Sequence, residues 1–304
     1  MIGIQSLIYR VVCLSIFDSI GQAFKYLVEC YRMVIEEPKL LLPSLLSVAI
    51  GFFISIFVVI ALMLFHVFGS VFFIFGGFLL VALFVSYAIS YILMASTAYA
   101  VYEHVKYGKS SLNKAFSMAL ARAPTILMIA LIAAIINVLV QSLKNPNHRR
   151  GVLAGFLATV FADAFNEGWK IASMLLIPTV VIGGYGFTDS FKKVFEIARN
   201  NLVLIGAGEV GIRVLTGIFA FVGIILSLAI AFGLFMLLDY ANTMLALAVA
   251  VIFAFTALSL VSTINIFIRI SYYTLIYAWA EERLEHGPET PVHAPAPLQN
   301  AFGI

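Results

Sequence analysis

The chain has 304 residues, of which 63% are apolar and 11% are charged, and its mean hydropathy is +1.08. A soluble globular domain carries about a quarter charged residues and just under half apolar ones. The composition therefore excludes most soluble folds and indicates a multi-pass membrane protein. The formal net charge is only +3. Because the basic residues are interspersed with acidic ones, we expect no nucleic-acid partner.

Residues 1–17 are apolar but contain Arg10. No basic segment precedes this stretch and no small-residue cleavage site follows it, so we expect an interfacial helix rather than a signal peptide. The two cysteines, Cys13 and Cys30, have neither CxxC spacing nor a neighbouring histidine. We interpret them as small apolar residues rather than metal ligands.

Six apolar segments are long enough to cross the bilayer, since a membrane-spanning helix needs about 20 apolar residues. They predict an all-α polytopic bundle in a single transmembrane domain over residues 1–286, with spans at about 40–65, 72–102, 123–143, 168–187, 205–236 and 241–268. Most Lys and Arg residues outside the spans fall on the side that carries both chain ends. The positive-inside rule therefore predicts a cell-membrane protein with both termini in the cytoplasm.

Residues 150–167 lie between the third and fourth predicted spans and are too short to cross on their own. They can form an interfacial helix or a re-entrant segment. Lipid tolerates re-entrant backbone only where protein or water shields it. We therefore favour the interfacial helix.

Three amphipathic segments each precede a pair of spans, at about 18–37, 110–122 and 188–200. Such helices lie in the headgroup plane with the apolar face roughly 5–10 Å deep. Their starts align as SIGQAFKYLV, SLNKAFSMAL and GFTDSFKKVF, which places Phe24, Phe116 and Phe191 in register. We interpret the pattern as a threefold internal repeat of an interfacial helix and a membrane hairpin. The alternative is three ordinary connecting helices without a shared origin.

Residues 201–215 match the pattern GxGxxG through Gly206, Gly208 and Gly211. In a dinucleotide-binding fold this turn follows a strand, and an acid about 20 residues later binds the ribose. Here no βαβ unit is predicted and the later position falls in an uncharged run, so we expect no cofactor. The small residues Ala207 and Gly211 are instead expected to let two helices pack closely.

Three charged residues lie close to long apolar runs and form the candidate site. Glu209 and Arg213 are four residues apart and so share a helix face, and Arg269 follows the last apolar run. An ionised group at the centre of a span costs about 2.5–3.5 kcal/mol, and pairing reduces this cost. Our hypothesis is an intramembrane charge cluster in which Glu209 pairs with Arg213, Arg269 or both. Two alternatives stay open: a solvated pair on a cytoplasmic helical extension over residues 201–213, and a substrate or ion pathway.

Polar residues also occur within the predicted spans, among them Ser96, Asn137 and Thr263. We expect these side chains to hydrogen-bond between helices. The segment 287–304 contains four prolines and is expected to be an extended tail, either free or bound to a protein partner.

The sequence contains no HExxH, GxSxG or nucleotide-binding loop, so we expect neither an enzyme nor a metal site. The first functional expectation is a homo-oligomeric membrane protein that organises lipid or binds a partner. The alternative is a channel or permease for ions or small solutes with Glu209, Arg213 and Arg269 along its path.

Two segments carry a family resemblance, GWKIASMLLIPTVVIGGYGFTDSFKKV at 168–194 and NIFIRISYYTLIYAWAEE at 265–282. Over roughly residues 20–285 the chain resembles a mainly prokaryotic, archaea-rich family of six-span membrane proteins known as a domain of unknown function. The family's proline-containing span is matched at Pro178, and its F-x-R-x-x-x-Y element is matched at 267–273. The resemblance implies the six-span fold and no assigned activity.

Relatives in that family often place an acid after the proline-containing span, where this chain has Gly183 and Gly184. A role that depends on this acid is therefore not expected here. The alternation of amphipathic helices and hairpins is also similar to that of CysZ-type sulfate permeases, which is an analogy of architecture alone.

Overall fold

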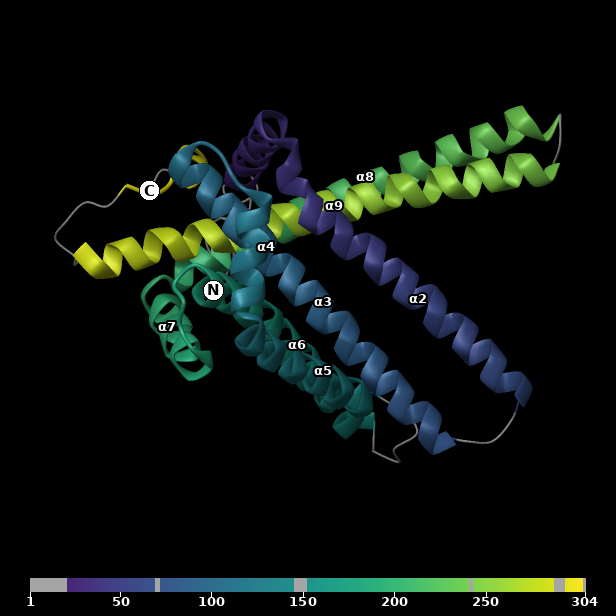
Figure 1. The fold of residues 1–304 in the computed structure, drawn as a ribbon, viewed down its shortest axis with the longest axis horizontal. Coiled ribbons are helices and arrows are strands. Elements are labelled where there is room, and N and C mark those ends of the chain that lie inside the picture. The colour runs from purple at the N-terminus through teal and green to yellow at the C-terminus, as the bar shows by residue number, and fades with distance from the viewer. Residues whose placement is uncertain (1–20, 69–71, 145–151, 241–242, 287–292, 303–304) are drawn as a thin grey trace, which may run out of the picture. The chain divides into compact units, whose positions relative to one another are not determined.

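The computed structural model describes residues 21–68, 72–144, 152–240, 243–286 and 293–302. Within these ranges every regular element is a helix (Figure 1). The all-α prediction is therefore confirmed. The helix predicted over residues 1–17, Cys13 and the first residues of the tail lie outside the described residues.

Four described helices are long and apolar enough to cross a membrane: Val81–Tyr107, Ala123–Lys144, Gly208–Asp239 and Thr243–His286. A fifth candidate results if Gly21–Glu36 and Pro38–Ile54, which are bent by 112°, form one broken span. These apolar helices indicate a membrane-embedded protein. The count of six spans stays a prediction.

The helices follow one another with short connections. The helix Gly21–Glu36, called helix 21–36 below, leads through the 3-10 helix η1 (Pro38–Leu41) into α2 (Leu42–Phe68). The others are α3 (Phe72–Tyr107), α4 (Leu112–Ala121), α5 (Ala123–Lys144), α6 (Val152–Val181), α7 (Phe187–Asn200), α8 (Leu202–Asp239), α9 (Thr243–His286) and α10 (Ala296–Phe302).

The chain divides into two compact units, one formed by Met1–Val48 and Ile197–Ile304 and the other by Ala49–Glu196. In the first unit α8 and α9 lie side by side, and α9 also contacts η1 and α10 (Figure 1). In the second unit α3 contacts α4, α5 and α6, and α5 contacts α6. The prediction that residues 1–286 form a single transmembrane domain stays a prediction.

Helix α6 is continuous over 30 residues, where we predicted a separate segment at 150–167 and a span at 168–187. Within α6 no proline lies before Pro178, so no missing backbone N–H breaks the helix over residues 152–177. Ala162 is buried against Ile136 and Val140 of α5, and Trp169 packs on the same cluster. The described part of the 150–167 segment thus belongs to a continuous helix about 45 Å long that packs along α5, and its position in the membrane stays a prediction.

The connection from α6 to α7 contains a glycine in the left-handed conformation. Gly184 has a φ of +72°, a conformation that favours glycine. A Cβ atom at this position would also lie 2.7 Å from Nη2 of Arg122. The turn therefore requires the glycine.

Helix α9 has 44 residues and continues well past residue 268, where the predicted span ends. At 1.5 Å per residue it is about 66 Å long, roughly twice the thickness of the hydrocarbon core. The apolar run stops at Arg269, but a charged residue does not end a helix. The residues after Arg269 are largely buried within the first unit, Tyr272, Tyr273 and Tyr277 among them.

A buried acid in the second unit fixes the start of α4. The carboxylate of Glu103 on α3 accepts the backbone N–H of Ser111 and the ammonium of Lys114, both at 2.8 Å. It thereby caps α4, whose Ser111 side chain makes no capping bond. The hydrogen bond to Glu103 raises the pKa of Lys114.

Residues 296–302 of the C-terminal tail form a helix, which corrects the predicted extended conformation for these residues; residues 293–295 have no regular secondary structure. Helix α10 contacts α9, and Leu298 is fully buried. Pro297 lies in the first turn, where a helix needs no N–H donor. Because Pro297, Leu298 and Ala301 share one face, they can be buried together while Gln299 and Asn300 stay exposed.

Candidate functional site

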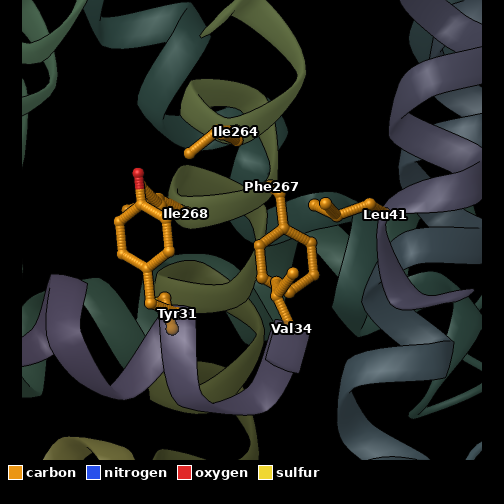
Figure 2. Close-up of a pocket in the computed structure, with 7 residues that line it drawn as sticks. Tyr31, Val34, Leu41, Ile264, Phe267 and Ile268 are labelled. Atoms are coloured by element: carbon orange, nitrogen blue, oxygen red, sulfur yellow. The ribbon is translucent and has the colours of Figure 1, made fainter. Parts of the chain in front are cut away.

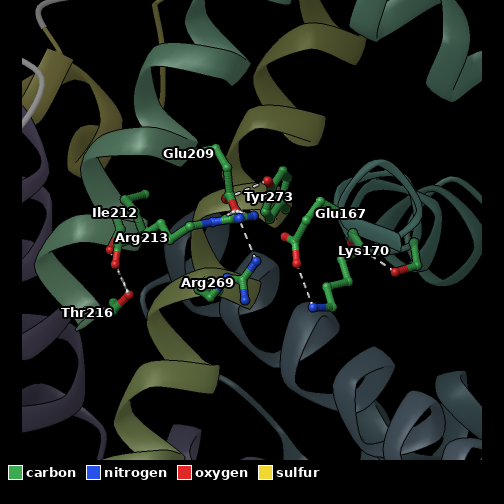
Figure 3. Close-up of polar contacts among 9 residues, drawn as sticks. Glu167, Lys170, Glu209, Ile212, Arg213, Thr216, Arg269 and Tyr273 are labelled. Carbon is green, nitrogen blue, oxygen red and sulfur yellow. Dashed lines mark hydrogen bonds and ion pairs between the residues drawn. The ribbon is translucent and has the colours of Figure 1, made fainter. Parts of the chain in front are cut away.

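The three charged residues of the candidate site meet between α8 and α9 in the first unit (Figure 3). Oε1 of Glu209 accepts hydrogen bonds from Nη2 of Arg213 at 2.8 Å and from Nη2 of Arg269 at 3.0 Å. Oε2 of Glu209 accepts the hydroxyl of Tyr273 at 2.6 Å. The structure therefore brings Glu209 together with both arginines and adds a tyrosine.

The spacing within each helix explains this geometry. Glu209 and Arg213 are one turn apart on α8, and Arg269 and Tyr273 are one turn apart on α9. Each helix thus presents two side chains to the same point. Tyr273 was not among the predicted site residues, although the F-x-R-x-x-x-Y spacing places it one turn from Arg269.

The four side chains differ in exposure. The side chain of Glu209 is 5% exposed, while those of Arg213 and Arg269 are 45% and 24% exposed. A buried carboxylate is costly unless donors satisfy it, and here three side chains do so. A fully solvated pair does not describe this arrangement, because the acid is buried even though Arg213 reaches the surface. The depth of the cluster in the membrane stays a prediction.

The glycine pattern beside the cluster serves the packing of the two helices. Residues 202–215 are helical throughout, so no strand precedes the GxGxxG pattern. A Cβ atom at Gly208 would lie 1.8 Å from the hydroxyl oxygen of Tyr272, whereas nothing lies within 4 Å of one at Gly206. Gly208 therefore allows Tyr272 to approach α8. We had predicted this role for Ala207 and Gly211; Gly211 is buried.

A group of buried tyrosines joins the cluster to helix 21–36. The ring of Tyr272 contacts Tyr273 edge to face at a centroid distance of 5.3 Å, and it contacts Tyr26 in the same way at 5.7 Å. Tyr31 of helix 21–36 also contacts Phe219 of α8. Helix 21–36 is thus packed on both α8 and α9.

An apolar pocket lies where helix 21–36, η1 and α9 meet (Figure 2). It is lined by Cys30, Tyr31, Val34, Leu41, Ile264, Phe267 and Ile268. Its lining contains no charged side chain, so it does not suit an ionic ligand. Among the described residues, no group of three or more His, Cys, Asp or Glu side chains could hold a metal ion.

Helix 21–36 has a second apolar side that the described part of the chain leaves uncovered. Its packed side carries the buried residues Tyr26 and Cys30. Beside them, Phe24, Val28 and Ile35 are 56%, 44% and 77% exposed. Their spacing of four and seven residues places them in one row along the helix.

The model of a family of unknown function, DUF6159, matches residues 75–286 of the chain. The chain belongs to this family, which confirms the resemblance to a domain of unknown function. The matched region contains the whole charge cluster and excludes helix 21–36. A comparison with curated proteins finds no match.

Proposed function

We propose that this member of the DUF6159 family is a multi-pass scaffold of the cell membrane that organises lipid or binds a partner without catalysing a reaction. It crosses the membrane six times, has both termini in the cytoplasm and forms a homo-oligomer. Helix 21–36, α4 and α7 lie in the cytoplasmic interface of the membrane. The C-terminal tail is an additional contact for a protein partner.

The uncovered apolar row on helix 21–36 is the observation that carries this proposal. A helix that packed only against protein would turn a wholly polar face outward, whereas this one exposes Phe24, Val28 and Ile35 beside its exposed charged residues Lys25, Arg32 and Glu36. The following helical segment, Pro38–Ile54, is bent by 112° from it. If that segment enters the membrane, the bend turns helix 21–36 along the membrane surface, where lipid covers its apolar row.

Exposed apolar residues also occur after helix 21–36. Leu42 and Leu45 follow the bend and are exposed as well. Exposed apolar residues also occur on the two other short helices, Leu120 on α4 and Phe195 on α7. Large exposed apolar patches are typical of surfaces that contact membranes or partners.

The hairpin of α8 and α9 exposes an apolar surface that a second copy of the chain could cover in the proposed oligomer. Beyond the charge cluster the two helices cover only one side of each other, and many large apolar residues remain exposed, among them Phe221, Leu226, Phe232, Leu237, Val251 and Ile252. Such a surface needs lipid or a second copy of the chain to cover it.

A channel or permease is the second candidate function, and the charge cluster is the observation that favours it. Ionisable groups inside a membrane often mark ion or substrate pathways. Glu209 is buried and forms ion pairs with Arg213 and Arg269. These pairs lie at the point where the uncharged runs of α8 and α9 end. In this candidate, Arg269 would attract the permeating anion.

Flux through reconstituted liposomes separates the two candidates. We expect the wild-type protein, Arg269→Ala and the control Arg199→Ala to pass anions and cations no faster than protein-free liposomes, because a scaffold has no pathway. Wild-type flux that Arg269→Ala abolishes and Arg199→Ala retains would overturn the scaffold in favour of the permease. Particle mass in lipid nanodiscs should correspond to two or more chains, and a monomer would contradict the proposed oligomer.

A further inference from the structure

The C-terminal segment, residues 293–302, is folded back onto its own unit. Its helix α10 has seven residues, which is too short for a helix to persist alone in water. The order of the segment therefore depends on docking. The docking is apolar, since Ala294, Leu298 and Ala301 are buried.

The docked segment also bonds to helix 21–36. The side-chain amide of Asn300 donates to Oε1 of Glu29 at 3.3 Å. The same oxygen accepts a hydrogen bond from Nη1 of Arg32, also at 3.3 Å. Because α10 contacts α9 as well, the segment bridges helix 21–36 and α9.

We propose that the C-terminal segment is an intramolecular ligand that holds helix 21–36 against α9, so that its release loosens this helix. The bridge is small: among the side chains that the structure describes, Leu298 is its largest buried one, and Asn300 donates a hydrogen bond to Glu29. A bridge of this size is a two-state element that can order and disorder. Coupling between two sites is reciprocal, so whatever binds the released segment also frees helix 21–36.

The bridge is independent of the proposed scaffold function and of where the membrane lies. The bound ligand is a segment of this chain, recognised by an apolar contact at Leu298 and an amide contact at Glu29. In the membrane, docking or release of the C-terminal segment would tighten or loosen helix 21–36, which carries the uncovered apolar row.

Hydrogen exchange of the full-length protein tests the coupling, measured by mass spectrometry in both detergent and nanodiscs. In Leu298→Asp we expect amide exchange in residues 293–302 and in residues 21–36 to become at least about tenfold faster, because the buried leucine anchor is lost. The matched control is Gln299→Asp, which adds the same charge at the neighbouring exposed position and should change exchange less than about twofold.

A chain that ends at His286 provides a second variant without any new buried charge. It should show the same fast exchange in residues 21–36, and a synthetic peptide of residues 287–304 should slow that exchange again. Unchanged protection of residues 21–36 after loss of the segment would overturn the proposal. Unprotected amides in residues 296–302 of the wild-type protein would overturn it as well.

Discussion

Glu209→Gln is expected to lower the free energy of unfolding by about 3 kcal/mol, because removal of one partner from a buried ion pair leaves the others uncompensated. In this variant Arg213 and Arg269 lose their shared negative charge, and the hydroxyl of Tyr273 loses an ionised acceptor. We place the effect at the low end of the range for buried pairs because Arg213 is half exposed and can turn to solvent. Thermal unfolding in detergent measures the loss.

The two arginines supply graded controls for this prediction. Arg213→Gln should cost at most about 1 kcal/mol, as is usual for an exposed pair, and Arg269→Gln should cost more because its side chain is better buried. The double variant of Glu209 and Arg269 should be less unstable than the sum of the single variants, by about 0.5–3 kcal/mol. Small and strictly additive effects would show that the cluster contributes no buried pairing.

Gly208→Ala is the second substitution with a large expected effect, a loss of at least about 1–3 kcal/mol from overpacking. The new methyl group would lie 1.8 Å from the hydroxyl oxygen of Tyr272 and 2.5 Å from its Cζ atom. Tyr272 is fully buried against Tyr26 and Tyr273 and has little room to retreat. The melting temperature of the purified protein measures the effect.

Gly206→Ala is the matched control, since it lies on the same helix with nothing within 4 Å of the added atom. It should be neutral or stabilising by up to about 1 kcal/mol, because alanine favours a helix over glycine. Combining Gly208→Ala with Tyr272→Phe should recover part of the loss, since the closest clashing atom is removed. Equal melting temperatures for the Gly206 and Gly208 variants would contradict the packing described between α8 and α9.

The composition of the candidate site could be predicted because charge is conspicuous in an apolar chain. Glu209, Arg213 and Arg269 stand out from uncharged surroundings, and helical periodicity indicates which of them share a face. Tyr273 carries no such signal, because a tyrosine is common in apolar helices. Only the pairing of α8 with α9 shows that its hydroxyl reaches Glu209.

Polar side chains within the helices bond either to a neighbouring helix or to their own helix, and the sequence does not distinguish the two. Asn137 does bond between helices, donating its amide to the hydroxyl of Tyr87. Ser96 and Thr263 instead donate to the carbonyls of Ile92 and Ser259 in their own helices. A short hydroxyl side chain can reach a carbonyl one turn back, which satisfies it without a neighbour.

Helix ends were harder to predict than helix positions. The length of an apolar run indicates which residues contact lipid, whereas a helix ends where its backbone hydrogen bonds end. Helix α9 therefore continues past Arg269, and α6 starts before the span predicted to begin at residue 168. The order of α10 was missed for a different reason. Its proline content favours an extended chain, and tertiary burial of Leu298 overrides this preference.

The threefold repeat stays a prediction. The described parts of the three aligned segments are helical apart from Ser111 and Gly186, and they lie in helix 21–36, α4 and α7. The residues in register nevertheless have different surroundings. Phe24 is exposed, whereas Phe191 stacks on Trp169.

Spin-label accessibility in nanodiscs tests the proposal that helix 21–36 lies on lipid with its uncovered apolar row. Single labels are placed at residues 24, 28 and 35 and, for comparison, at 25 and 32, in a Cys13→Ser background with the buried Cys30 retained. If the row faces lipid, labels at 24, 28 and 35 will be accessible to oxygen and shielded from a water-soluble nickel complex, and labels at 25 and 32 will show the reverse. Nickel access at all five positions would contradict it.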